Sequence, residues 1–391
     1  MSKRILIFNS TEYILDEAST RLERSNMIYT IAQKSGIEIT FITSKFNHFT
    51  KKYRIINNPN IITLWTIPYY KNISIWRFIN HLILGLNLML LLFKKRHDYD
   101  VIYVSFPPIE TAFASVIISK LLGKESIVDF RDRWPELITE NTQSKLIKLL
   151  VKFYKYPRNY AVRNCTKLIS TSPEFLRNIC EVSGIHNSEQ PLLEAVNMSY
   201  RKPGFVKEKR ITGNIELIFS GSFVLQEGSA LRDFLRIFLS TERRDISLKL
   251  CGDGPMRPTL EDMAKDDPRV VFTGFLTESD LHAALSEAHF GVLPYKPVSH
   301  FEFSYPNKLG EYLAFGLPII TSLNKGAVAN LVEEKKFGFT YDYQNSYQLR
   351  DILDNLSIDH VTALEKVCHG TFKESFNADT VYKKFVDENF K

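Results

Sequence analysis

Short runs of β-branched and aromatic residues alternate with helical stretches along most of the chain. In the first half, the runs that predict buried strands are residues 4–10, 38–44, 61–67, 100–106, 126–130 and 167–172. Stretches with helical spacing lie between most of these runs, at residues 19–34, 75–93, 110–122 and 143–162. This alternation is typical of parallel strands joined by crossover helices. The first half is therefore predicted to be a doubly wound α/β domain.

The second half repeats this alternation of strands and helices. Its predicted strands are residues 215–221, 246–252, 270–274, 290–295, 318–322 and 337–341. Three of them end in glycine, which lets the backbone approach a ligand at the carboxyl edge of a sheet. We therefore predict a second α/β domain, with ligands bound where the strand ends of both domains surround one cleft.

A polar segment between the two predicted domains marks their boundary. Residues 199–214 contain few apolar side chains and are typical of a linker. We predict an N-terminal domain over residues 1–205 and a C-terminal domain over residues 206–375. No predicted strand follows the last helical stretch, so residues 376–391 are expected to pack back toward the N-terminal domain.

The stretch FEFSYPNKLGEYLAFGLPII predicts a loop, a short helix and a buried strand. Pro306 suits the first helical turn, and Gly316 suits the left-handed residue after the last turn. The unpaired N–H groups at the start of such a helix form an anion site, which Lys308 strengthens with a full charge. Glu311 lies one turn deeper and offers two acceptors to a vicinal diol such as a ribose. The alternative is that both are ordinary solvated helix formers.

Composition excludes several other chemistries. The four cysteines are far apart in sequence, which indicates a reducing cytosol without disulfides or a zinc site. The histidines form no ligand-like cluster, and no nucleotide-binding or protease motif of the common types appears. The N-terminus reads as a first buried strand and not as a cleaved signal. We expect no metal and no cofactor.

Charge divides the chain into two unequal halves. Residues 1–205 carry 28 Lys and Arg against 17 Asp and Glu, whereas the remainder carries 22 against 27. The basic half predicts an anionic partner, either a bilayer face, a lipid diphosphate or nucleic acid, unless it is simply a solvated surface. The apolar run at residues 82–93 is shorter than the ~20 residues that a bilayer requires. It is predicted to form a core helix, or a helix that also touches the membrane surface.

Four segments in sequence order resemble one enzyme family. PNKLGEYLAFGLPIITS resembles the nucleotide-sugar helix of the GT-B glycosyltransferases of retaining family four, and LKLCGDGPMRPTLEDMA and VVFTGFLTESDLHAALSEAHFGVLPY resemble its neighbouring segments. DVIYVSFPPIETAFASVIISKLLGKESIVDFRDRWPE resembles the acceptor domain of members that build bacterial surface polysaccharides. The likeness covers nearly the whole chain. It implies two Rossmann-like doubly wound domains that face a central cleft.

The resemblance also implies a donor site. Its residues would be Gly221, Ser222, Gly274, Phe275, Leu276, Asn307, Lys308, Leu309 and Glu311. Glu311 would bind the ribose, residues 307–309 the diphosphate and residues 274–276 the nucleobase, while residues 221–222 would let their loop approach the phosphates.

On the acceptor side, the resemblance implies a catalytic role for Asp132. Its carboxylate would orient the acceptor hydroxyl or help to deprotonate it, with Arg131 beside it and Glu110 also on the acceptor side. The alternative for Asp132 is a salt bridge to Arg131 or Arg133, or a helix cap.

Two positions depart from the family pattern. Where many members carry the first of two glutamates, this chain has Phe303, and Glu302 is one residue out of register. Where members often carry Gly-Arg and then Lys-Gly, this chain has Gly221-Ser222 and Glu227-Gly228. Both expected diphosphate cations are therefore missing, and Lys308 is the residue that would compensate.

The resemblance predicts a retaining, metal-independent hexosyltransferase of surface polysaccharide synthesis. Its donor is expected to be a nucleotide sugar, UDP-linked by preference, and its acceptor a lipid-linked or oligosaccharide molecule. The basic domain is expected to bind the anionic inner face of the plasma membrane peripherally from the cytoplasm, with no nucleic acid as partner. The alternatives are a nucleotide-sugar 2-epimerase of the same architecture and a non-catalytic nucleotide-sugar binding protein.

Overall fold

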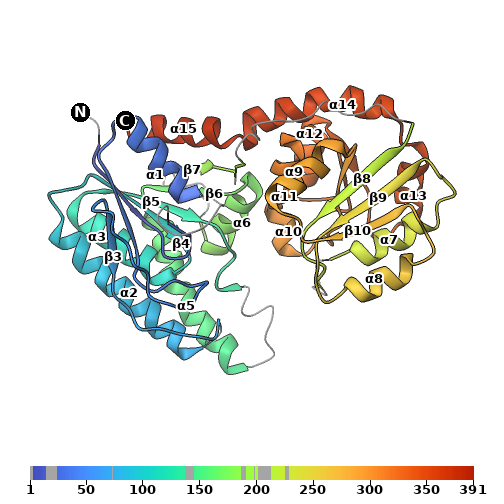
Figure 1. Cartoon of the computed structure of the whole chain (residues 1–391). Helices are drawn as coiled ribbons and strands as arrows, with labels where there is room; N and C mark the ends of the chain where they lie inside the picture. Colours follow the sequence, from blue (N-terminus) through green and yellow to red (C-terminus); the bar gives the residue numbers. More distant parts are fainter. Residues whose placement is uncertain are drawn as a thin grey trace. The chain divides into compact units, whose positions relative to one another are not determined.

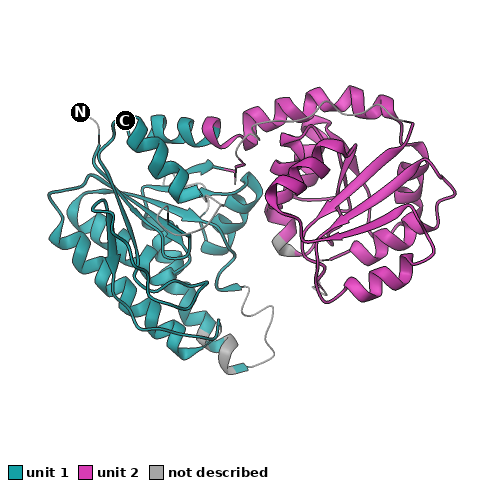
Figure 2. Ribbon diagram, viewed as in Figure 1, with its two compact units in different colours: residues 1–196, 381–391 teal, residues 197–380 magenta. Residues whose placement is uncertain are grey.

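The computed structural model divides the chain into two compact units. It describes residues 3–14, 24–72, 74–136, 145–185, 191–197, 199–200, 213–224 and 229–391. Unit 1 comprises Met1–Val196 and Val381–Lys391, and unit 2 comprises Asn197–Thr380 (Figure 2). Most of the predicted linker at residues 199–214, and the departure at Glu227-Gly228, lie outside the described residues.

Unit 1 is built on a seven-stranded parallel sheet in the order β3-β2-β1-β4-β5-β6-β7. The strands are β1 (Ile5–Phe8), β2 (Ile39–Ser44), β3 (Ile61–Leu64), β4 (Val101–Phe106), β5 (Glu125–Phe130), β6 (Lys167–Ser170) and β7 (Leu192–Ala195). The first six confirm the predicted strands. The edge strand β7 was not predicted, because its sequence LLEA has no β-branched residue and its side chains are mostly exposed.

Helices cover both faces of this sheet (Figure 1). They are α1 (Arg24–Lys34), α2 (Ile75–Lys94), α3 (Ile109–Leu122), α5 (Lys145–Asn164), α6 (Pro173–Ser183) and α15 (Ala378–Asn389). α2, α3 and α5 lie in a row on one face, and α1 and α15 lie on the other. α15 is held in unit 1 by Phe385, whose ring packs edge-on against the buried Tyr103. The chain runs outward from β1 to β3 and then returns to β4 beside β1, so the winding direction changes between β1 and β4.

Unit 2 contains a six-stranded parallel sheet in the order β10-β9-β8-β11-β12-β13. Its strands are β8 (Ile215–Ser220), β9 (Ile246–Cys251), β10 (Val270–Gly274), β11 (Phe290–Leu293), β12 (Ile319–Thr321) and β13 (Gly338–Thr340). All six confirm the predicted strands, most of them shortened at an end. The winding direction of this sheet changes between β8 and β11, which is where open α/β sheets bind ligands.

Two layers of helices bury the faces of the second sheet. They are α7 (Leu231–Leu239), α8 (Arg257–Ala264), α9 (Glu278–Glu287), α10 (Ser299–Phe303), α11 (Asn307–Ala314), α12 (Ala327–Lys335), α13 (Ser346–Asn355) and α14 (Ile358–Thr371), followed by a π-helical turn at Phe372–Phe376. One apolar core includes Phe234, Leu260 and Leu349, and the other includes Leu285 and Leu313. Burial of both faces explains why these strands read as nearly continuous apolar runs.

Candidate active site

The helix predicted from the PNKLGEYLAFG stretch is α11, and it begins beside the point where the winding direction changes. It is shorter than predicted: Pro306 is the residue before the helix, with φ −57° and ψ 138°, and Ala314 ends it. Gly316 adopts the predicted left-handed conformation, with φ 66°. Leu309, Tyr312 and Leu313 are fully buried, so the core determines which face of α11 is left for a ligand.

Lys308 projects from the first turn of α11 over the end of β8. Its Nζ donates a hydrogen bond to the Tyr295 hydroxyl at 2.9 Å and lies 5.4 Å from the centroid of the Phe219 ring. A Cβ atom placed on Gly221 would lie 2.6 Å from this Nζ, so the ammonium group sits directly against the backbone at Gly221. Sequence reasoning missed Tyr295. The available signal was its position: it is the polar residue at the end of the apolar run FGVLPY, just after β11.

The ammonium group of Lys308 forms no ion pair with a described carboxylate. By contrast, Lys325 in the same unit pairs with Glu302 at 2.8 Å. Glu302 is the glutamate that lies one residue out of register with the family pattern. Its carboxylate already binds a cation, Lys325. The half-buried charge of Lys308 is therefore available to an anion at the start of α11.

Glu311 lies one turn after Lys308, at the same strand end. Its Oε2 is 3.5 Å from the Ser220 hydroxyl, and the adjacent Tyr312 hydroxyl accepts a hydrogen bond from the Ser220 N–H at 3.0 Å. Burial raises the pKa of Tyr312, so its phenol stays neutral and serves to anchor β8 to α11. The structure thus places Lys308 and Glu311 at the end of β8, beside Gly221 and Ser220. Their role in donor binding stays a prediction.

The predicted glycine positions pack backbone against backbone. The Gly221 N–H bonds the Cys251 carbonyl at 2.8 Å. A Cβ on Gly252 would lie 1.8 Å from the Gly221 carbonyl oxygen, and one on Gly254 would lie 2.5 Å from that of Phe223. Only glycine fits at positions 252 and 254. These positions add no side chain to the edge of the sheet beside Lys308.

The other predicted donor residues differ in how far they are exposed to solvent. Ser222, Phe275 and Asn307 are exposed, and Gly274 has the left-handed φ of 73° that turns the chain from β10 toward α9. Leu276 is partly buried against the apolar core. Leu309 is fully buried, and its N–H bonds the Pro306 carbonyl at 2.9 Å. Leu309 therefore anchors α11, while Asn307 and Lys308 present polar groups.

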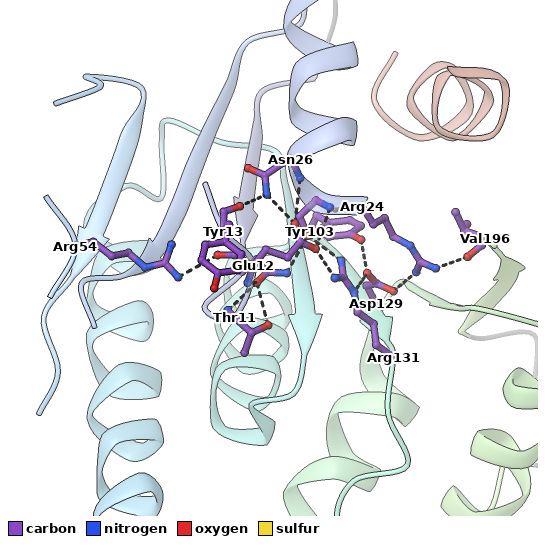
Figure 3. A network of polar contacts seen from close by, with 12 residues as sticks. Thr11, Glu12, Tyr13, Arg24, Asn26, Arg54, Tyr103, Asp129, Arg131 and Val196 are labelled. Atoms are coloured by element: carbon purple, nitrogen blue, oxygen red, sulfur yellow. Dashed lines mark hydrogen bonds and ion pairs between the residues drawn. The ribbon is translucent and has the colours of Figure 1, made fainter. Parts of the chain in front are cut away.

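Arg131, predicted beside the acceptor, lies in a buried ionic network of unit 1 (Figure 3). Its guanidinium binds Asp129 at 2.6 Å and also the carboxylate of Glu12. Arg24 binds the other oxygen of Asp129 at 2.5 Å and donates to the Val196 carbonyl. Burial opposes ionisation of Asp129, but the two guanidinium groups outweigh it and lower its pKa. Arg131 thus links β5 to the segment after β1.

Asp132 comes directly after this network. Its carbonyl accepts a hydrogen bond from the Trp134 N–H at 2.8 Å, which forms a tight turn at the end of β5. Its side chain is partly buried. The described part of the chain contains no group of three metal-ligating side chains, around Asp132 or elsewhere. The catalytic role of Asp132 stays a prediction.

Glu110, the other predicted acceptor-side residue, is largely buried at the start of α3, with 11% of its side chain exposed. The Tyr154 hydroxyl of α5 donates to its Oε1, and Oε2 has no hydrogen-bond partner. A Cβ on Gly85 of α2 would lie 2.9 Å from the Glu110 Cβ, so three helices enclose this carboxyl group. Burial raises its pKa to about 7, despite the opposing hydrogen bond from Tyr154. A group that titrates near neutrality is suited to proton transfer.

Glu110→Gln is expected to change how stability depends on pH. Between pH 4.5 and 7 the folded carboxyl is protonated while the unfolded one is ionised, so the unfolding free energy of the parent falls as pH rises. The amide removes this loss, and the variant should gain up to about 3 kcal/mol relative to the parent across that window. Urea denaturation at several pH values measures the difference. The exposed Glu333→Gln is the control, and a pH-independent difference for Glu110→Gln would contradict the assignment.

Comparisons with known proteins find similarity in one family and in many structures. Residues 214–359 match the model of the family described as "Glycosyl transferases group 1". No curated protein matches the chain. Similar solved structures include the lipopolysaccharide outer core galactosyltransferase WaaB in its apo form, with 14% identity, 98% of each chain covered and a TM-score of 0.66.

Two further structures show how broadly this fold is used. Anabaena Alr3699/HepE in complex with UDP has 12% identity, with 98% of this chain and 99% of that chain covered and a TM-score of 0.65. UDP-GlcNAc 2-epimerase from Methanocaldococcus jannaschii also has 12% identity, with the same coverage and a TM-score of 0.54. At these identities the likeness concerns the fold alone. The family match, by contrast, spans the residues around Lys308.

Proposed function

We propose that the chain is a group 1 glycosyltransferase of the retaining GT-B type that takes its sugar from a nucleotide sugar, and that this donor is UDP-linked. The observation that carries the donor site is the unneutralised ammonium of Lys308, held against Gly221 where the winding direction changes. The family match over residues 214–359 includes both. Support for uridine comes from Anabaena HepE, which shares the fold and is in complex with UDP.

The geometry suggests how donor cleavage is assisted. Lys308 and the N-terminus of α11 place positive charge where the diphosphate acquires negative charge as the sugar–phosphate bond breaks. Glu311 is proposed to accept hydrogen bonds from the ribose hydroxyls. In this scheme the leaving phosphate itself assists deprotonation of the acceptor, and Asp132 orients the hydroxyl. No protein nucleophile and no metal are required.

Thermal unfolding with a panel of nucleotides tests the donor proposal. UDP, dTDP, GDP, ADP and CMP are each added at a concentration about 100 times a micromolar dissociation constant, where a binding ligand stabilises by ~2.7 kcal/mol. UDP is expected to raise the midpoint most in the parent and to lose this effect in Glu311→Ala. If another nucleotide stabilises more, the UDP assignment is wrong. If none stabilises the protein, the donor site itself is wrong.

We further propose that the acceptor is lipid-linked or an oligosaccharide of surface polysaccharide synthesis, reached at the cytoplasmic face of the plasma membrane. Support comes from an apolar face of unit 1. Its exposed side chains are Ile75, Trp76, Phe78, Leu82, Leu86, Leu90 and Phe93 on α2 and Leu149, Phe153 and Tyr156 on α5. The two helices meet where the Phe78 and Tyr154 rings lie 5.4 Å apart. This set is called the α2–α5 face.

The chemistry of the α2–α5 face fits an anionic bilayer surface. Cations accompany its apolar residues: Lys94, Lys95 and Arg96 follow Phe93 at the end of α2, Lys145 begins α5, and Lys152 lies between Leu149 and Phe153. α2 is also, by length and composition, a helix that could cross a membrane. However, Leu84, Leu88 and Leu92 on its opposite side are buried, and α2 packs against α3. This division into one packed and one exposed apolar side favours a helix lying in the interface plane.

Vesicle flotation tests this membrane contact. The protein is expected to float with vesicles that contain phosphatidylglycerol and much less with pure phosphatidylcholine. Leu86→Glu combined with Leu90→Glu should reduce flotation at least several-fold, because two charges then face the acyl chains. Tyr347→Glu, at an equally exposed aromatic residue of unit 2, is the control. Equal flotation of parent and double variant would refute the assignment of this face.

A further inference from the structure

Two cations of unit 1 converge on one short loop. The Lys51 Nζ donates a hydrogen bond to the Asn72 Oδ1 at 2.8 Å, and the Arg77 guanidinium donates to the Asn72 carbonyl at 2.7 Å. Both lie over the ring of Tyr69, with Nζ 4.6 Å and the guanidinium carbon 5.9 Å from its centroid. Lys51 lies in the loop after β2, and Arg77 lies in the first turn of α2, the helix after β3. Because β2 and β3 are neighbours, the pair lies at the carboxyl edge of the sheet.

Neither cation, Lys51 or Arg77, forms an ion pair with a described carboxylate. Burial lowers the pKa of Lys51, and the nearby charge of Arg77 lowers it further. The charge of Arg77 also acts on the carboxyl group of Glu110 on α3, but the two side chains do not form an ion pair, and the Tyr154 hydroxyl donates to Glu110 Oε1. Two cations that converge on one loop without a described ion-pair partner form a site for an external anion.

The local backbone and the adjacent helix support the same conclusion. Lys51 has a φ of 57°, a conformation that a side-chain-bearing residue adopts at a cost and that is concentrated at ligand sites. α2 begins at Ile75, where the Ser74 hydroxyl accepts from the Arg77 N–H at 3.2 Å, so the positive end of a long helix adds to the potential. His48 contributes no charge at neutral pH, because burial, Arg77 and Lys51 lower its pKa to about 4.

Aromatic and apolar groups border the cations. The Arg77 guanidinium carbon lies 5.5 Å from the centroid of Trp134, on the turn that carries Asp132. On its other side begins the α2–α5 face, whose first residues Ile75 and Trp76 are 65% and 59% exposed. An anion bound by Lys51 and Arg77 would therefore have the predicted acceptor-side carboxylate near one side and an apolar, membrane-suited stripe on the other.

We propose that Lys51 and Arg77 bind the phosphate or diphosphate group of a lipid-linked acceptor, with its apolar chain running along the start of α2. The identification of the bound molecule as the acceptor rests on the proposed function, whereas the anion site itself does not. The two cations supply charge-assisted hydrogen bonds to the phosphate oxygens. Trp134 and the exposed residues at the start of α2 would border the remainder of the molecule.

Direct binding of three probes to the full-length protein tests the proposal. The probes are farnesyl diphosphate, farnesol and inorganic diphosphate, measured by isothermal titration calorimetry below the concentration at which the lipids form micelles. Farnesyl diphosphate is expected to bind most tightly. Lys51→Gln and Arg77→Gln should each weaken its binding about tenfold or more, as expected for loss of a hydrogen bond to a charged group. Exposed Lys52→Gln is the matched control and should leave the affinity unchanged.

The variants also separate this site from the donor site. Lys308→Ala should leave farnesyl diphosphate binding unchanged, and the Lys51 and Arg77 variants should retain stabilisation by nucleotides. Loss of farnesyl diphosphate binding in Lys308→Ala alone would overturn the proposal, because the lipid would then occupy unit 2. Equal affinity for inorganic and farnesyl diphosphate would overturn the lipid assignment. Equal affinity for farnesol would overturn the anion site.

Discussion

Lys308→Ala is expected to weaken the binding of the donor nucleotide by about 10- to 100-fold. The ammonium is half-buried, lies against the Gly221 backbone and has no described carboxylate partner. A hydrogen bond to a charged group is worth ~1.5–3 kcal/mol, which corresponds to this range of affinity. Because the expected Arg and Lys of the family pattern are absent, no described side chain at this edge replaces it. Calorimetric titration with the nucleoside diphosphate that stabilises the parent measures the loss.

Two controls make the Lys308 result specific. Lys265→Ala removes the exposed lysine directly after α8, which pairs with Asp262, and this variant should bind nucleotide as the parent does. Tyr295→Phe removes the neutral partner of Lys308 and should cost much less than the loss of the charge itself. An affinity of Lys308→Ala within twofold of the parent would remove this residue from the donor site.

Asp129→Ala is expected to destabilise unit 1 by about 3–5 kcal/mol, the usual effect of removing one partner of a buried ionic group. Asp129 is fully buried and binds Arg24 at 2.5 Å and Arg131 at 2.6 Å, with a further hydrogen bond from the Tyr103 hydroxyl. Its removal leaves Arg24, which is also fully buried, without a counter-ion. The free energy of unfolding in urea measures the effect.

An exposed ion pair of the same unit provides the comparison. Asp98 lies 3.3 Å from Lys95 on the surface, and Asp98→Ala should change the unfolding free energy by less than about 1 kcal/mol. If Asp129→Ala behaves like Asp98→Ala, the network in Figure 3 does not hold unit 1 together. In that case Arg131 is free to serve the acceptor as predicted.

The fold class and most strand positions follow from local pattern. Runs such as VVFTG at β10 carry β-branched residues between turn-forming ones, and the structure places β10 at those residues. α11 was placed within a few residues, because Pro306 fixes its own φ and Gly316 readily adopts the left-handed conformation that ends a helix. β7 escaped prediction because an edge strand with exposed side chains needs no apolar pattern.

The candidate site was predicted only where its residues are neighbours in sequence. Lys308 and Glu311 are one helical turn apart, so their common face followed from helix geometry. Tyr295, thirteen residues earlier, was not recognised as the partner of Lys308. Arg131 was expected to face the acceptor, whereas its partners are Glu12, 119 residues away, and the buried Asp129.

The sequence by itself therefore determined two parallel α/β folds, the glycine-ended strands and the helix that carries Lys308 and Glu311. These depend on side-chain periodicity and backbone restriction, which act over a few residues. Only the tertiary structure decided that Lys308 has no ion-pair partner among the described residues, that the pKa of Glu110 is about 7, and that Lys51 and Arg77 both bind Asn72. Charge pairing and desolvation depend on which strand ends and helices come together, and that is set by packing between segments far apart in the chain.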